Sequence, residues 1–179
     1  MRPRETIEQF DLFLKKHGLS LSAVIIGGSA LSLLRVISRE TRDFDVLHPP
    51  LTGEIIKAQA AFAAEMRRQG IPLDDHWLND NPVSVADLLP EGWLSRTQVV
   101  YQGSAVTLLS LSRDDMLLTK LFAYCDRGTD LGDCLALKPS ADELRASLPW
   151  IVKQDAHPDW PSHVEESIRE LARRLGHEL

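Results

Sequence analysis

The sequence lacks the features that would place the chain in a membrane or in an oxidising compartment. No apolar run approaches the ~20 residues that a membrane-spanning helix needs. The 179 residues include only two cysteines, Cys125 and Cys134, and these show no metal-ligand spacing. A charged amphipathic segment stands where a secretory signal would be apolar. We therefore expect reduced thiols and a cytoplasmic location.

Basic residues are also scarce, with 20 Lys and Arg against 26 Asp and Glu and a formal net charge of −6. Broad coating of nucleic acid needs clustered basic residues, so general DNA binding is disfavoured, although a local basic groove is compatible with this balance. The sequence contains neither Gly-x-x-x-x-Gly-Lys-Ser/Thr nor Gly-x-Gly-x-x-Gly, which excludes a Walker loop and a dinucleotide fold. What remains is an ordinary globular composition, 44% hydrophobic.

Apolar periodicity and turn residues predict a mixture of helices and strands. Helices are expected at 6–17, 28–37, 53–69 and about 112–127, and further ones from about 129, 140 and 162. Strands are expected at 23–26, 43–47, 77–78, 96–101 and 105–110, the last two as a hairpin. This order predicts an α/β (α+β) fold with a mixed sheet of four or five strands and flanking helices. We expect a core at 1–137 and a helical C-terminal extension, 138–179, packed on the same domain.

The most informative segment combines a glycine turn with two carboxylates. An apolar run enters Gly27, Gly28 and Ser29, and the next predicted strand carries Asp43 and Asp45. Because side chains alternate along a strand, both carboxylates should face one side while the phenylalanine between them faces the core. Two carboxylates on one face suit a hard cation such as Mg²⁺. A glycine turn that opens a helix offers backbone N–H groups to a phosphate.

Simpler interpretations apply to the same residues. Asp43 and Asp45 could lie at an exposed strand end, with Arg39 and Arg42 as counter-charges. Ser29 could cap a tight turn from strand to helix. Since a capped helix start is also an anion site, the two interpretations of Ser29 are compatible.

Four motifs in order resemble the nucleotidyltransferase fold of the polymerase-β-like superfamily, and more closely the branch of small bacterial AbiEii/MenT-type toxins. The motifs are Gly27-Gly28-Ser29-Ala30-Leu31, Arg39 to Asp45, Lys120, and Arg127 to Asp133. The first two are fairly specific, whereas the lysine and the Asp-x-x-Asp mean little alone. The resemblance implies transfer of a nucleotidyl group from a nucleoside triphosphate to an acceptor hydroxyl, dependent on Mg²⁺ or Mn²⁺.

The resemblance also implies roles for individual residues. It makes Asp43 and Asp45 the metal ligands and, together with Lys120 and Asp130, the catalytic residues. It assigns nucleotide binding to Gly27, Gly28, Ser29, Arg39 and Thr41. Lys120 has an alternative as a snorkelling surface lysine. Asp130 and Asp133 have an alternative as acidic residues that begin a helix.

Many nucleotidyltransferases use a third carboxylate on a later strand to help the acceptor hydroxyl attack. Here Asp74, Asp75 and Asp80 lie in a loop-rich region, and none is assigned to that role. By resemblance we expect a toxin-like enzyme that modifies tRNA or protein and that has a cognate antitoxin as partner. The alternative is a non-catalytic nucleotide-binding or protein-interaction module on the same fold, which a missing third carboxylate would fit.

Overall fold

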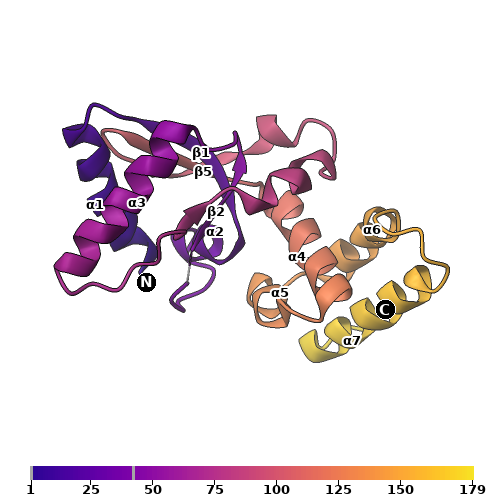
Figure 1. Ribbon diagram of the computed structural model, residues 1–179. Coiled ribbons are helices and arrows are strands. Elements are labelled where there is room, and N and C mark those ends of the chain that lie inside the picture. The colour runs from indigo at the N-terminus through magenta and orange to yellow at the C-terminus, as the bar shows by residue number, and fades with distance from the viewer. Residues whose placement is uncertain (1, 42) are drawn as a thin grey trace. The chain divides into compact units, whose positions relative to one another are not determined.

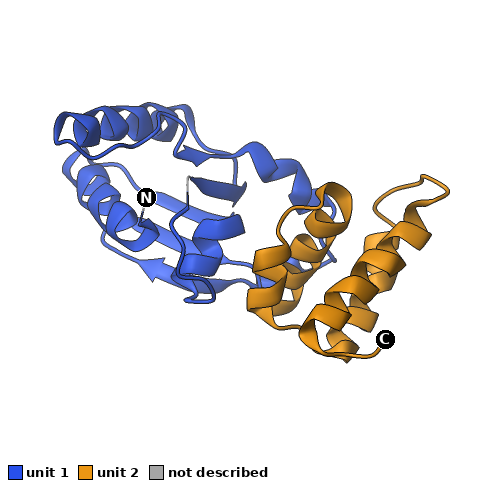
Figure 2. Ribbon diagram, turned by 90° about the horizontal axis from the view of Figure 1, so that it is seen from below, with its two compact units in different colours: residues 1–112 blue, residues 113–179 orange. Residues whose placement is uncertain are grey.

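The computed structural model describes residues 2–41 and 43–179, and the chain divides into two compact units, Met1–Ser112 and Arg113–Leu179 (Figure 2). The first unit contains the sheet, and the second is helical. The predicted boundary after residue 137 falls inside the second unit, between two of its helices. Within the described residues, no helix is both long enough and apolar enough to cross a membrane.

A five-stranded mixed sheet forms the centre of the first unit, in the order β3-β2-β1-β5-β4. Strand β1 runs antiparallel to β2 and parallel to β5, while β3 is parallel to β2 and β4 is antiparallel to β5. The predicted mixed sheet and its hairpin are confirmed. The elements of this unit are α1 (Pro3–Lys16), β1 (Leu21–Ile26), α2 (Gly27–Leu33), β2 (Phe44–His48), α3 (Gly53–Arg68), β3 (Leu78–Asn79), the 3₁₀ helices η1 (Asn81–Asp87) and η2 (Trp93–Arg96), β4 (Gln98–Gln102) and β5 (Val106–Ser110).

Aromatic side chains join α1 and α3, which lie side by side, to the sheet (Figure 1). The ring of Phe10 on α1 lies 5.2 Å from that of Phe62 on α3 and 5.0 Å from that of Trp77, measured between centroids. Phe44, the first residue of β2, meets Trp77 edge-on at 5.8 Å. This cluster fixes which face of β2 points toward α1 and α3, because each large ring buries extensive apolar area.

The β4–β5 hairpin is held to α1 by a buried carboxylate. Asp11 accepts hydrogen bonds from the backbone N–H groups of Ser104, Ala105 and Val106 at 3.1, 2.8 and 2.7 Å. Burial raises the pKa of Asp11, but the three N–H donors outweigh it and leave the pKa below its ordinary value of 3.8. Asp11 therefore anchors a turn about ninety residues away in sequence, which no local pattern indicates.

The second unit consists of four helices: α4 (Arg113–Arg127), α5 (Leu131–Leu137), α6 (Ala141–Val152) and α7 (Trp160–Leu175). Gly128, at φ +65°, ends α4 as predicted. A capping box between Ser140 and Glu143 begins α6, again as predicted. The predicted start of α7 at Ser162 is wrong by two residues, because the helix begins at Trp160 and accommodates Pro161 in its first turn.

Candidate functional site

The two carboxylates of the first unit lie at the beginning of β2. Phe44 is fully buried, whereas Asp43 and Asp45 on either side of it are half-buried. Asp45 pairs with Ile26, the last residue of β1, so it lies beside the turn from β1 into α2. Strand alternation thus directs Phe44 into the aromatic core and leaves the flanking carboxylates off that face.

Gly27 allows the Asp45 carboxylate to lie against the start of α2. Gly27 has φ +75°, and a Cβ placed on it would lie 2.8 Å from Oδ2 of Asp45. Its role thus has two parts: a left-handed backbone that other residues rarely adopt, and space for a carboxylate oxygen. Pairing of β1 with β2 brings Oδ2 of Asp45 to this turn. In the part of the chain that the structure describes, no side chain caps the start of α2.

Gly28 creates a second close approach on the same turn. A Cβ on Gly28 would lie 3.0 Å from Cγ2 of Thr41 and 3.5 Å from a guanidinium nitrogen of Arg39. Thr41 is buried, and its hydroxyl donates to the backbone oxygen of Asp43 at 3.5 Å, a long contact. The fold therefore gathers Arg39 and Thr41 at the glycine turn, although more than ten residues separate them from it.

The alternative role of Ser29 as an N-cap is wrong. The helix begins at Gly27, so Ser29 is its third residue, and its buried hydroxyl is directed back toward the Ile26 carbonyl at 3.4 Å. The positive φ of Gly27 lets the chain pass from strand to helix without a capping side chain. A direct contact of the Ser29 hydroxyl with phosphate stays a prediction. Arg42, the other predicted counter-charge, lies outside the described residues.

Asn79 is a member of this site that the sequence did not indicate. Strand β3 pairs Asn79 with Asp45, and the Asn79 amide donates to Oδ1 of Asp45 at 3.2 Å. This bond orients one oxygen of the carboxylate, while the other, Oδ2, faces Gly27. The predicted short strand at 77–78 was the available signal, but its partner in the sheet could not be known from a two-residue element.

The oxygen donors of Asp43 and Asp45 are of the kind that a hard divalent cation accepts. Mg²⁺ is commonly held by one or two carboxylates, with water and substrate phosphates completing its shell. Asp43 and Asp45 supply such oxygens. Among residues 2–41 and 43–179 there is no group of three or more His, Cys, Asp or Glu side chains placed to hold a metal.

The three aspartates considered for a third carboxylate have other partners. Asp75 forms an ion pair with Arg67 at 2.7 Å. Asp74 accepts from the backbone N–H of His76 at 2.7 Å, and Asp80 accepts from that of Leu51 at 2.9 Å. These contacts hold the loop after α3, so the third carboxylate stays unassigned.

Lys120, in the second unit, lies between two carboxylates. Its Nζ donates to Oδ1 of Asp130 at 2.8 Å and to Oδ2 of Asp133 at 2.7 Å, and the residue is only 7% exposed. Burial lowers the pKa of Lys120, but hydrogen bonds and ion pairs with the two aspartates raise it above its ordinary 10.5. The alternative of a snorkelling surface lysine is therefore wrong, because the ammonium group is buried and paired.

The backbone around Asp130 is arranged to bring its side chain back to α4. Asp130 has φ +63°, an unusual conformation for a residue with a side chain, and directly precedes α5. Oδ2 of Asp130 lies 3.7 Å from the Arg127 guanidinium. Asp133 is buried and approaches Lys120 from the first turn of α5. The expectation that Gly128 turns the chain so that Asp130 faces Lys120 is confirmed.

The two cysteines are buried in the same unit. Burial raises the pKa of Cys125 and of Cys134 to about 12, so both are neutral thiols near pH 7. The Cys134 thiol donates to the Lys120 carbonyl at 3.4 Å. They form no disulfide, which agrees with the expectation of reduced cysteines.

In this mixed sheet a glycine turn lies against Asp45 of β2, and Asp43 directly precedes that strand, an arrangement that fits a nucleotidyltransferase-like domain. The comparison with protein families agrees: residues 4–137 match the family described as "Nucleotidyltransferase of unknown function (DUF6036)", and the chain belongs to this family. The match includes every predicted site residue. No curated protein and no solved structure gave a significant match. Membership of the AbiEii/MenT-type branch stays a prediction.

Proposed function

We propose that the protein is a metal-dependent nucleotidyltransferase that moves a nucleotidyl group from a nucleoside triphosphate to an acceptor hydroxyl. The observation that carries the proposal is the close approach of Oδ2 of Asp45 to Gly27. It places a carboxylate oxygen at the glycine turn that begins α2. Membership of a nucleotidyltransferase family supports the same reaction class. In this reaction the acceptor oxygen attacks the α-phosphorus and pyrophosphate leaves.

Each residue of the first unit has a distinct task in this proposal. Asp43 and Asp45 would hold Mg²⁺ or Mn²⁺, and Asn79 would keep the Asp45 carboxylate in one orientation. The bound cation would neutralise negative charge on the triphosphate oxygens. Gly28 and Ser29 would bind phosphate at the start of α2, and the Arg39 guanidinium, which lies beside Gly28, would pair with phosphate oxygens.

The assignment of Lys120 and Asp130 to the reaction stays a prediction from the family resemblance. Their mutual ion pair gives the lysine a structural task as well, since an ammonium group buried against two carboxylates cannot be removed without cost. A role in catalysis would therefore have to be separated from a role in folding.

The acceptor follows only from the resemblance. We propose a toxin-like enzyme acting on tRNA or protein, paired with a cognate antitoxin. A non-catalytic nucleotide-binding module is the second candidate, favoured by one observation: Asp74, Asp75 and Asp80 are all engaged in holding the loop after α3.

Titration calorimetry with each nucleoside triphosphate, in Mg²⁺ and in chelator, tests the proposal. Wild-type affinity should fall at least about tenfold in chelator, and Asp43→Asn and Asp45→Asn should lose most of this metal dependence. Glu54→Gln is the matched control, because Glu54 is an exposed acid at the start of α3, which follows the far end of β2. Equal affinity with and without metal would contradict the proposal.

Transfer of label separates the enzyme from the binding module. The protein is incubated with α-labelled nucleoside triphosphate, Mg²⁺ and either total RNA or lysate protein. Label on one of these acceptors, abolished by Asp45→Asn, would support transferase activity. Metal-dependent binding without any transferred label would favour the module.

A further inference from the structure

The outer surface of α1 and α3 forms a groove of about 350 Å³. It is lined by residues 9, 12, 13 and 16 of α1, by residues 62, 65 and 66 of α3, and by residue 69 directly after α3, so each side contributes positions i, i+3, i+4 and i+7. This spacing is one face of a helix, and two such faces side by side normally pack against further helices. Here both faces border the groove, and their outer residues, Leu12 and Lys16 among them, are exposed.

The groove combines an apolar floor with an exposed apolar side chain. Phe62 and Met66 are almost fully buried in the floor, and Phe13 meets the Phe62 ring at 5.5 Å between centroids. Leu12 on α1 is 64% exposed, more than any other large hydrophobic residue in the part of the chain that the structure describes. A surface that carries both a depression and a protruding leucine can fit a copy of itself, since the leucine of one copy can enter the depression of the other.

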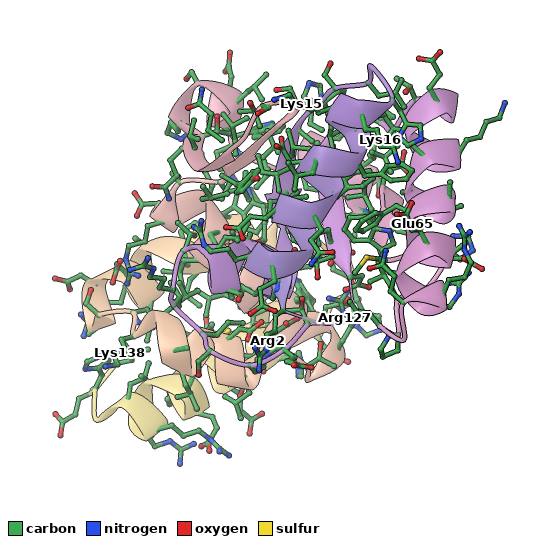
Figure 3. All side chains as sticks on the ribbon, turned by 90° about the vertical axis from the view of Figure 1, so that its left-hand side faces the viewer. Arg2, Lys15, Lys16, Glu65, Arg127 and Lys138 are labelled. Atoms are coloured by element: carbon green, nitrogen blue, oxygen red, sulfur yellow. The ribbon has the colours of Figure 1, made fainter. Side chains whose placement is uncertain are left out.

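The charges on the two rims are opposite. Lys16 lies on the α1 rim and Glu65 on the α3 rim, as Figure 3 shows from the side of these helices. Within residues 2–41 and 43–179, neither side chain forms an ion pair, and Glu65 has only a 3.5 Å contact with the Gln69 amide. Each rim therefore offers a charge that the opposite rim of a second copy would match.

We propose that this groove is the interface of a symmetric homodimer. A two-fold axis along the groove exchanges the two helices, so α1 of each copy faces α3 of the other and four helices pack together. Lys16 then faces Glu65 of the partner subunit, and the reciprocal pair forms on the other side. Leu12 enters the floor of Phe13, Phe62 and Met66.

Sedimentation velocity on the full chain over a dilution series tests the apolar part. The wild type should show a monomer–dimer equilibrium, and Leu12→Ser should raise its dissociation constant roughly tenfold or more. Ile56→Ser is the matched control, because Ile56 is 46% exposed on α3 but does not line the groove. It should leave the dissociation constant unchanged. A wild type that stays monomeric, or equal effects of both substitutions, would overturn the proposal.

Charge reversal tests the symmetry. Lys16→Glu and Glu65→Lys should each weaken the dimer roughly tenfold, because each places like charges together twice. Mixing the two variants should restore the dimer, since both pairs in the mixed dimer are again opposite in sign. Urea denaturation of each variant verifies that the two substitutions leave the fold intact. Failure of the mixture to recover would exclude this arrangement, even if the wild type dimerises through another face.

Discussion

Two groups of carboxylates in this protein have the same chemistry and opposite surroundings. In the second unit, Asp130 and Asp133 close on Lys120 at 2.8 and 2.7 Å, and the lysine is 7% exposed. In the first unit, Asp43 and Asp45 flank a buried phenylalanine and stay half-buried. In the part of the chain that the structure describes, the Asp43 carboxylate has no hydrogen-bond or ion-pair partner.

The difference separates the paired, buried carboxylates of Asp130 and Asp133 from the half-buried carboxylate of Asp43. If one member of a buried ion pair is lost, the other is left as an uncompensated buried charge. Removing either residue therefore lowers the stability of the fold. A half-buried carboxylate with access to water carries a smaller penalty and can exchange water for a cation. The predictions that follow test this contrast by substituting one member of each group.

The largest effect is expected for Lys120→Ala. Removing the ammonium group takes away the buried cation between Asp130 and Asp133 and leaves only the exposed Arg127 guanidinium, 3.7 Å from Asp130, so the free energy of unfolding should fall by about 3–5 kcal/mol. Urea denaturation of the full chain measures it. Lys153→Ala, on an exposed lysine of the same unit, should change stability by less than about 0.5 kcal/mol. Similar losses for both lysines would break the contrast.

Asp11→Ala should cost nearly as much, although Asp11 belongs to the first unit. The substitution leaves three backbone N–H groups of the hairpin without their acceptor, which should lower stability by about 3 kcal/mol. Glu8→Ala, one turn earlier on the exposed face of α1, should cost less than about 1 kcal/mol.

The effect of Asp11→Ala should also depend on pH. Because the folded-state pKa of Asp11 lies below 3.8, its carboxylate stabilises the fold fully above that value, and the contribution is lost as pH falls through the lower folded-state pKa. The stability difference between wild type and Asp11→Ala should thus be constant near neutrality and shrink in acid. A difference that grows on acidification would contradict the assigned hydrogen bonds.

Gly27→Ala should lower stability by an intermediate amount, and it should also weaken metal-dependent binding of the triphosphate. A left-handed φ costs a residue with a side chain about 1–2 kcal/mol, and the added methyl group must also displace the Asp45 carboxylate. Gly18→Ala separates the two terms, since Gly18 has φ +67° with nothing within 4 Å of an added Cβ. Only the Gly27 variant should lose metal-dependent triphosphate binding, measured by calorimetry.

The smallest effect on stability is expected for Asp43→Asn. A half-buried carboxylate without a partner among the described residues contributes little to folding, so the change should be below about 0.5 kcal/mol. Thermal and urea unfolding measure it beside the binding experiment. A loss comparable with that of Lys120→Ala would show that Asp43 has a structural task and would remove the contrast between the two units.

Local patterns were enough to predict most of the elements. The glycine at position 128 ends a helix because it readily adopts positive φ, and Ser140 with Glu143 begins one because their side chains satisfy backbone groups three residues apart. Two predicted helix starts were wrong because a neighbouring residue changed how the helix begins. Gly27 makes a capping serine unnecessary, and Pro161 permits α7 to begin before Ser162.

The sequence by itself determined the alternation of helices and strands, and it predicted a common face for Asp43 and Asp45. These features follow from backbone dihedrals and side-chain period, which act over a few residues. Only the tertiary structure decided that Asn79 binds Asp45, that Asp11 holds the β4–β5 hairpin, and that Lys120 is buried instead of snorkelling. Such contacts join residues between ten and about ninety-five positions apart. They are set by which elements pack together, because burial makes a charged or polar group stable only where the fold brings it a partner.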